Sequence, residues 1–167
     1  MIRKKKFYVK PKKAFEAGRI KEENLLIKKY GLKNKREIWK ASARINYLRS
    51  RAKALAKSSH AEQNVLFKKL QDIGFNVSSI ADVLGLKVEN WLDRRLATVV
   101  AKKGIASTPR QARQMITHRK ILVRGETINV PGYIVRVDEE NKISLKQKQP
   151  KQKTESKEEQ KGEEKNG

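Results

Sequence analysis

The spacing of the apolar residues changes once along this chain, and that change constrains the fold more than any other feature. Up to about residue 117 the apolar residues recur every three or four positions, as they do on one buried face of a helix. After that they come in short runs at 121–123, 134–137 and 143–145, which is typical of strands. The sequence therefore predicts an α+β protein that is mainly helical and ends in a short antiparallel strand bundle.

Start and stop residues divide the helical part. Thr108 is a capping residue, it is followed by a proline, and Gln111 comes three residues later, a spacing that starts a helix. Together with the apolar period, such signals predict helices over 22–30, 36–57, 60–73, 80–85, 89–104 and 109–117. Residues 124–127 and 138–140 are predicted to be turns.

The chain carries far more positive than negative charge. It has 41 Lys and Arg against 18 Asp and Glu, a net charge of +23. A surface of this kind calls for a polyanion, which can be nucleic acid, an anionic membrane or an acidic protein, and the charge favours nucleic acid. Residues 1–57 alone hold 20 basic and 4 acidic side chains, a net charge of +16.

Several classes of function are disfavoured by the residue types. There is no cysteine, and neither His60 nor His118 has acidic residues at metal-ligand spacing, so we expect no metal, no cofactor and no enzymatic activity. There is no phosphate-binding loop motif, and we expect no small-molecule substrate. No apolar run is long enough to span a membrane, and no secretory signal is recognisable, so we expect a soluble cytoplasmic protein without a membrane partner.

Two groups of basic residues point to nucleic acid. Arg36, Lys40, Arg44 and Arg51 form a stripe on one helix, and no acid occurs between residues 40 and 57, whereas solvated helix faces usually mix both signs.

The second group surrounds the helix that Thr108 begins. Its free N–H groups and positive dipole end can bind an anion, and Arg110 and Arg113 add donors suited to phosphates. We expect Arg94 and Arg95 of the preceding helix to lie beside them. Because RNA duplexes hide their base edges in a deep groove, such a site would recognise shape.

These residues also resemble a known family. The stretch "RRLATVVAKKGIASTPRQARQMITHRKILVRGETINVPGYIVRV" resembles the small RNA-binding module named after ribosomal protein S-four, which consists of two helices and a short strand bundle. The stretch "YGLKNKREIW" resembles the archaeal and eukaryotic branch of the ribosomal protein itself. The two resemblances cover about residues 15–145.

The resemblance implies a protein that binds the 5′ region of small-subunit ribosomal RNA, helps nucleate assembly, and contacts neighbouring ribosomal proteins in the cytoplasmic small subunit. The expected organisation is a basic extended segment at 1–20, a helical RNA-binding domain at 21–90, the module at 91–145 and a disordered charged tail at 146–167. Two alternatives are an RNA-modifying or ribosome-associated factor that uses the module as an anchor, and a membrane or general polyanion binder.

Eighteen residues are predicted to contact RNA, from their charge and position or from the resemblance. They are Lys33, Asn34, Lys35, Arg36, Lys40, Arg44, Arg51, Arg94, Arg95, Thr108, Arg110, Gln111, Arg113, Gln114, His118, Arg119, Lys120 and Arg124.

Two of these residues carry more detailed expectations. We expect Arg113 to face the same RNA strand as Arg110, so Arg113→Ala should change stability by no more than about 0.5 kcal/mol and weaken RNA binding by roughly 1.5–3 kcal/mol. Arg119 stands where relatives commonly have a glycine, so a positive φ at this position would cost about 1 kcal/mol.

Overall fold

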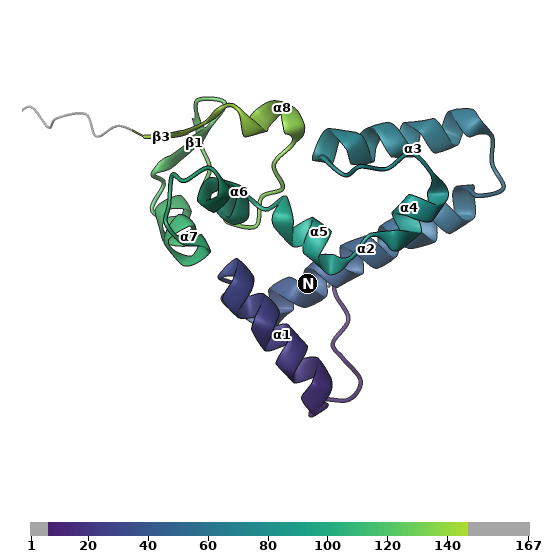
Figure 1. The fold of residues 1–167 in the computed structure, drawn as a ribbon, viewed down its shortest axis with the longest axis horizontal. Helices are drawn as coiled ribbons and strands as arrows, with labels where there is room; N and C mark the ends of the chain where they lie inside the picture. Colours follow the sequence, from purple (N-terminus) through teal and green to yellow (C-terminus); the bar gives the residue numbers. More distant parts are fainter. Residues whose placement is uncertain (1–6, 147–167) are drawn as a thin grey trace, which may run out of the picture.

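A computed structural model of the protein describes residues 7–146. It shows a mainly helical molecule with one small antiparallel sheet, which confirms the predicted fold class (Figure 1). The elements in chain order are α1 (Ala17–Tyr30), α2 (Lys35–Leu55), α3 (His60–Ile73), α4 (Ile80–Gly85), α5 (Val88–Asp93), α6 (Leu96–Lys102), α7 (Pro109–Thr117), β1 (Ile121–Val123), β2 (Glu126–Thr127), α8 (Val137–Glu140) and β3 (Ile143–Leu145). The expectations for residues 1–6 and 147–167 lie outside the described residues.

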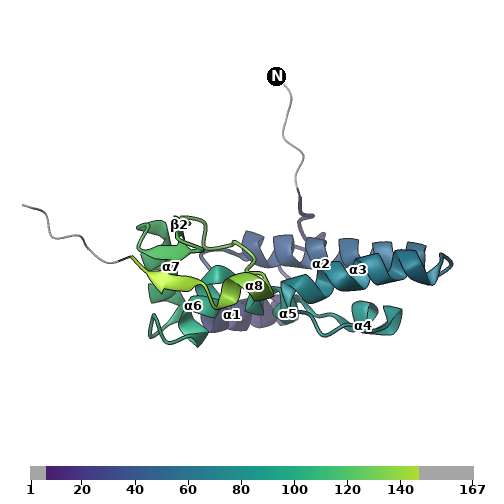
Figure 2. The ribbon, with the colours of Figure 1, turned by 90° about the horizontal axis from the view of Figure 1, so that it is seen from above.

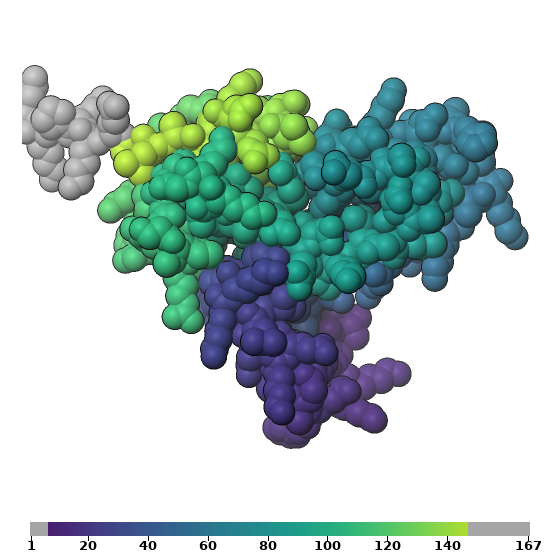
Figure 3. Space-filling view, viewed as in Figure 1, coloured from purple at the N-terminus to yellow at the C-terminus, as the bar shows by residue number. Residues whose placement is uncertain are grey.

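The long helix α2 organises the N-terminal part. Its first half packs against α1 and α5 around Tyr30, Ile38 and Leu92, and its second half packs against α3 and α4 around Ile45 and Leu70. Two small cores are therefore built on one helix. In the space-filling view α1 projects from the body on one side, and α2 and α3 reach away from the module on another (Figure 3).

The remaining elements form a third core. Helices α6 and α7 pack against the sheet around Leu96, Ala112, Ile116 and Ile121. The strand order is β2-β1-β3, and both pairings are antiparallel. This unit is the two-helix module that the sequence predicts, and it lies at the opposite end of the molecule from the α2–α3 turn (Figure 1).

The prediction of one helix over 89–104 is wrong. The chain leaves the helical conformation at Arg95, whose φ and ψ are −73° and 142°, so α5 and α6 are separate. The amide of Leu96 donates to the carbonyl of Tyr133 at 2.8 Å, and the amide of Val135 donates to the carbonyl of Arg94 at 2.9 Å. These bonds to a distant segment replace the bonds of a continuous helix.

Three further expectations are corrected near the C-terminal end of the module. The run 134–137 is not a strand: Ile134 forms an isolated bridge with Arg95, and Val137 begins α8. Residues 138–140 lie in that short helix instead of a turn, because the Glu139 carboxylate accepts hydrogen bonds from the Tyr133 hydroxyl and the Arg136 amide. Within 124–127 only the first two residues form the turn, since β2 begins at residue 126.

Helix α1 begins at Ala17, before the apolar pattern from Glu22 predicts it. Arg19 explains the earlier start: its guanidinium donates to the Glu23 carboxylate at 2.8 Å and to the carbonyls of Lys13 and Ala14. Because of these polar contacts, the helix begins earlier than its apolar residues alone predict.

Candidate nucleic-acid interface

Most of the residues predicted to contact RNA are accessible. Fourteen of the eighteen are exposed. They are Lys33, Asn34, Arg36, Lys40, Arg44, Arg51, Thr108, Arg110, Gln111, Gln114, His118, Arg119, Lys120 and Arg124. The other four, Lys35, Arg94, Arg95 and Arg113, are half-buried or buried, and each of them forms an ion pair with a carboxylate.

The basic stripe on α2 has no acidic partner within the part of the chain that the structure describes. No carboxylate of residues 7–146 forms an ion pair with Lys40, Arg44 or Arg51. Arg44 instead lies over the Phe7 ring, 5.9 Å from its centroid, and Arg51 donates to the Tyr47 hydroxyl. The positive charge of this stripe is therefore available to a polyanion.

The start of α7 forms as the sequence predicts, but other groups of the protein already bond to it or cover it. The Thr108 hydroxyl accepts from the Gln111 amide, and the Gln111 side chain accepts from the Ser107 amide. A Cβ at Gly31, the residue that ends α1, would lie only 2.8 Å from the backbone nitrogen of Arg110. Because the end of α1 covers this first turn, the backbone of α7 is not an open phosphate site.

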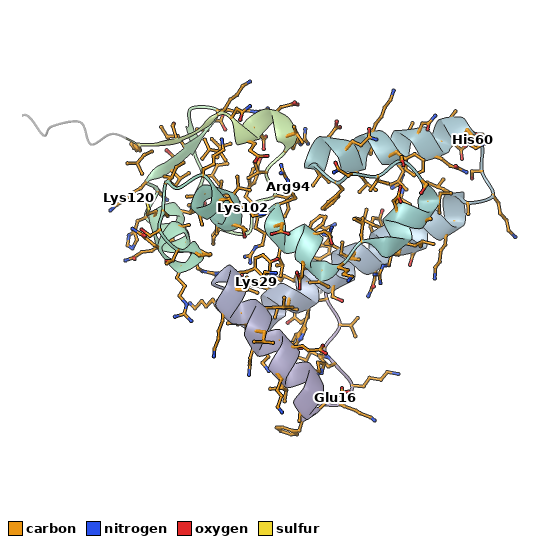
Figure 4. All side chains as sticks on the ribbon, viewed as in Figure 1. Glu16, Lys29, His60, Arg94, Lys102 and Lys120 are labelled. Carbon is orange, nitrogen blue, oxygen red and sulfur yellow. The ribbon has the colours of Figure 1, made fainter. Side chains whose placement is uncertain are left out.

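The outward side of α7 continues into two tight turns. Arg110, Gln114 and His118 are spaced four residues apart and line one helix face. We call the exposed residues from here to the β1–β2 turn the outer basic surface: Arg110, Gln114, His118, Arg119, Lys120 and Arg124. Figure 4 shows Lys120 at the end of the molecule that is farthest from His60.

Two arginines of this surface, Arg119 and Arg124, have a positive φ, a conformation that residues other than glycine seldom adopt. Arg119 has φ +56°, and the bonds from its own amide to the Ile116 carbonyl and from the Lys120 amide to the Met115 carbonyl close the end of α7. The sequence left the conformation of this turn open. Arg124 and Gly125 both have positive φ, as a two-residue hairpin turn requires. Arginine occupies positions at which glycine or asparagine would be less strained.

A carboxylate between the two parts of the molecule holds two of the predicted arginines. Glu37 on α2 accepts hydrogen bonds from the guanidiniums of Arg95, at 2.5 Å, and Arg113, at 2.9 and 3.0 Å. The Arg95 side chain is only 8% exposed. We call these three residues the Glu37 cluster. Arg113 therefore faces α2, and it does not share the outward face of Arg110.

The electrostatics of the Glu37 cluster favour a charged carboxylate. Burial raises the pKa of Glu37, but hydrogen bonds from Arg113 and Arg95 outweigh burial, and the net pKa is lowered. A lowered pKa means that Glu37 stabilises the fold at pH values above its unfolded pKa. This contribution is lost as the pH falls through the lowered folded value.

Arg94 joins the module to the other end of the helical part. It donates to the Glu140 carboxylate at 2.9 Å and to the Val135 carbonyl at 3.1 Å. Its guanidinium also lies against Gly74, where a Cβ would come within 2.8 Å of it. Figure 4 shows Arg94 between α8 and the end of α3. Arg95, through Glu37, and Arg94, through its contact with Gly74, thus link the module to the helical part.

Sequence reasoning missed Glu37, which organises this junction. One signal was available: Glu37 is one of only four acids among residues 1–57, and the other three lie before residue 24. An isolated acid within a strongly basic region often marks an internal ion pair, because cations that must be buried need a partner. Lys35 is similarly paired, with Glu23 at 3.2 Å.

The described residues contain no cluster of three or more His, Cys, Asp or Glu that could hold a metal ion. Among residues 7–146 no helix combines the length and the apolar character needed to cross a membrane.

The structure thus has a helix pair on a three-stranded sheet, packed against a helical body, with many exposed cations that have no carboxylate partner among residues 7–146, as is typical of proteins that bind polyanions. The S4 domain family matches residues 94–141. The protein is 41% identical to the small ribosomal subunit protein uS4 of Methanoregula boonei, over 87% of this chain and 84% of the relative. It is 43% identical to the protein of the same name from Methanothermobacter thermautotrophicus, over 89% of this chain and 91% of the relative. The chain belongs to the uS4 family of small ribosomal subunit proteins, as its resemblance to the archaeal branch predicts.

Proposed function

We propose that the protein binds the 5′ region of small-subunit ribosomal RNA and helps nucleate assembly of the cytoplasmic small subunit. It acts there as a structural component and not as an enzyme, beside neighbouring ribosomal proteins. Residues 21–90 and 91–145 both contribute to the RNA-binding surface. The exposed members of the predicted set are the RNA contacts, and Lys35, Arg94, Arg95 and Arg113 position them.

The observation that carries this proposal is the separation of the cations into two populations. Arginines at the junction are paired with carboxylates, whereas Lys40, Arg44 and Arg51 have no carboxylate partner among residues 7–146, and the same holds for most of the outer basic surface. Unpaired cations in this number repel one another unless phosphates neutralise them. Binding of phosphates releases counterions, so the affinity should fall steeply with salt.

Filter binding to separate 5′ and 3′ fragments of small-subunit RNA tests the proposal. We expect the 5′ fragment to bind more tightly, with a steep dependence of log affinity on log salt. The double variant Arg110→Ala/Lys120→Ala should reduce that slope by about 1 to 2.

The matched control is Lys68→Ala/Lys69→Ala, which removes two exposed cations from α3 that are outside the predicted set. Equal effects of the two double variants, or equal affinity for both RNA fragments, would contradict the proposal. Omission of the protein from a small-subunit reconstitution tests assembly, and an undiminished yield of 5′-domain particles would contradict that part.

A further inference from the structure

A cleft separates α2 from the segment 130–134 of the module. It is open to solvent, has a volume of about 530 Å³, and extends from Lys40 and Arg44 on α2 to Val130 and Pro131 on the opposite side. This volume lies within the range of about 300–1,000 Å³ that is usual for ligand sites. In Figure 2, α2 runs along the opposite side of the molecule from α4, and the first described residues lie beside α2.

The cleft combines cations with apolar surface. Four of its lining residues are Lys or Arg and one is Glu37, so its formal charge is +3. Since Glu37 already engages two of these cations, Lys40 and Arg44 remain exposed without a carboxylate partner in the described chain. Val130, on the opposite side of the cleft, is 55% exposed and adds apolar surface to its lining.

An aromatic ring of the chain itself already occupies the mouth. Phe7 lines the cleft, and its ring centroid lies 5.9 Å from the Arg44 guanidinium carbon. The ring is held weakly, since Phe7 is 71% exposed. The site therefore accepts a flat ring against Arg44, and the ring that is there now can be displaced at small cost.

A ligand that pairs an anionic group with a flat, partly apolar ring fits these features. A base within an RNA duplex cannot enter, because both of its faces are stacked on neighbouring bases, whereas an unpaired base has free faces. Stacking of bases on aromatic rings and guanidiniums, beside a cationic track for the backbone, is a general mode of single-strand binding.

We propose that this cleft binds one unpaired nucleotide of the RNA, with its base on Arg44 in place of the Phe7 ring and its phosphate on Lys40. The proposal rests on the proposed function, and it adds that the bound RNA presents an unpaired nucleotide between the two parts of the protein. The outer basic surface, in contrast, contacts the backbone.

Chemical probing of base reactivity on the 5′ RNA fragment, bound to the full chain, tests the proposal. We expect the wild-type protein to protect at least one unpaired base. Val130→Glu places a negative charge at the cleft and should restore the reactivity of that base while the rest of the footprint persists. The affinity should fall about tenfold, as expected for the loss of one stacked base.

Val65→Glu is the matched control, because Val65 on α3 is 52% exposed and lies outside the cleft. It should leave both the footprint and the affinity unchanged within about twofold. If both variants lose affinity equally, or if no unpaired base changes its reactivity while the footprint persists, the cleft proposal is overturned and the proposed function stands. Absence of any footprint would overturn both.

A second measurement does not depend on the large RNA. Phe7→Ala removes the ring that competes for Arg44 and should tighten binding of single-stranded pentauridylate by a few-fold, without changing the binding of a short RNA duplex. Weaker pentauridylate binding, or an equal change for the duplex, would also overturn the cleft proposal.

Discussion

The Glu37 cluster and the outer basic surface both contain arginines, but those arginines have different surroundings. In the cluster, Arg95 and Arg113 are drawn towards one half-buried carboxylate. On the outer surface, Arg110 and Arg119 are exposed and have no ion pair within the described chain. A basic motif therefore identifies a binding site only when the cations that form internal ion pairs are excluded from it.

Removal of the shared carboxylate should have the largest effect. Glu37→Ala leaves Arg95 buried without a partner, and we expect the free energy of unfolding to fall by about 3 kcal/mol, as when one member of a buried ion pair is removed. Denaturant unfolding measures the change. The control is Glu22→Ala, which removes an exposed acid from α1 and should cost no more than about 0.5 kcal/mol. Equal stability of the two variants would show that the cluster does not hold the parts together.

Gly31 tests the contact between α1 and α7. It has φ +59°, and a Cβ there would lie 2.8 Å from the Arg110 nitrogen and 3.0 Å from the Pro109 carbonyl carbon. Gly31→Ala should therefore cost about 2 kcal/mol, from the strained backbone and the forced separation of two helix ends. Gly104→Ala is the control, since Gly104 also has a positive φ but open space around it, and it should cost about 1 kcal/mol. Thermal melts that show equal losses would mean that the close approach is unimportant.

The two arginines of α7 belong to different regions: Arg113 to the Glu37 cluster and Arg110 to the outer basic surface. Arg113→Ala should lower the free energy of unfolding by about 1 to 2 kcal/mol, because Glu37 loses one of its two charged partners. Arg110→Ala should leave stability within about 0.5 kcal/mol and weaken RNA binding by roughly 1.5–3 kcal/mol. Melting curves and filter binding separate the two. The expectation that Arg113→Ala is neutral for stability comes from the sequence alone, and a neutral result would restore Arg113 to the RNA-facing group.

The smallest expected effect has opposite signs for stability and binding. Arg119 has φ +56°, so Arg119→Gly should stabilise the protein by about 0.5–1 kcal/mol by relieving the strain at the end of α7. The same change removes a cation from the outer basic surface and should weaken RNA binding. A variant that is less stable, or that binds RNA as tightly as the wild type, would show that this position has been misassigned.

Local sequence signals predicted a large part of this architecture. The cap at Thr108, the helix start after Ser79 and the ends of α1 and α3 at Gly31 and Gly74 are all found in the structure. The spacing of Ser59 and Glu62 also predicts a capping box, but the Ser59 side chain makes no capping hydrogen bond, so that prediction is wrong. Each of the confirmed features depends on residues within about one helical turn, so the pattern contains all the information that is needed. The exposure of most predicted RNA contacts follows for a similar reason, since charged residues opposite an apolar face remain in solvent.

The sequence by itself determined the helical period, the change to strands and the need for a polyanion, because these follow from neighbouring residues and from total charge. Only the tertiary structure decided which cations are available. Glu37 reaches Arg95 across 58 positions and Arg113 across 76 positions of the chain, and the break before α6 depends on backbone bonds to residues 133–135. The energies of such contacts arise from burial of a charge beside its partner, and no pattern of neighbouring residues specifies which distant groups will meet.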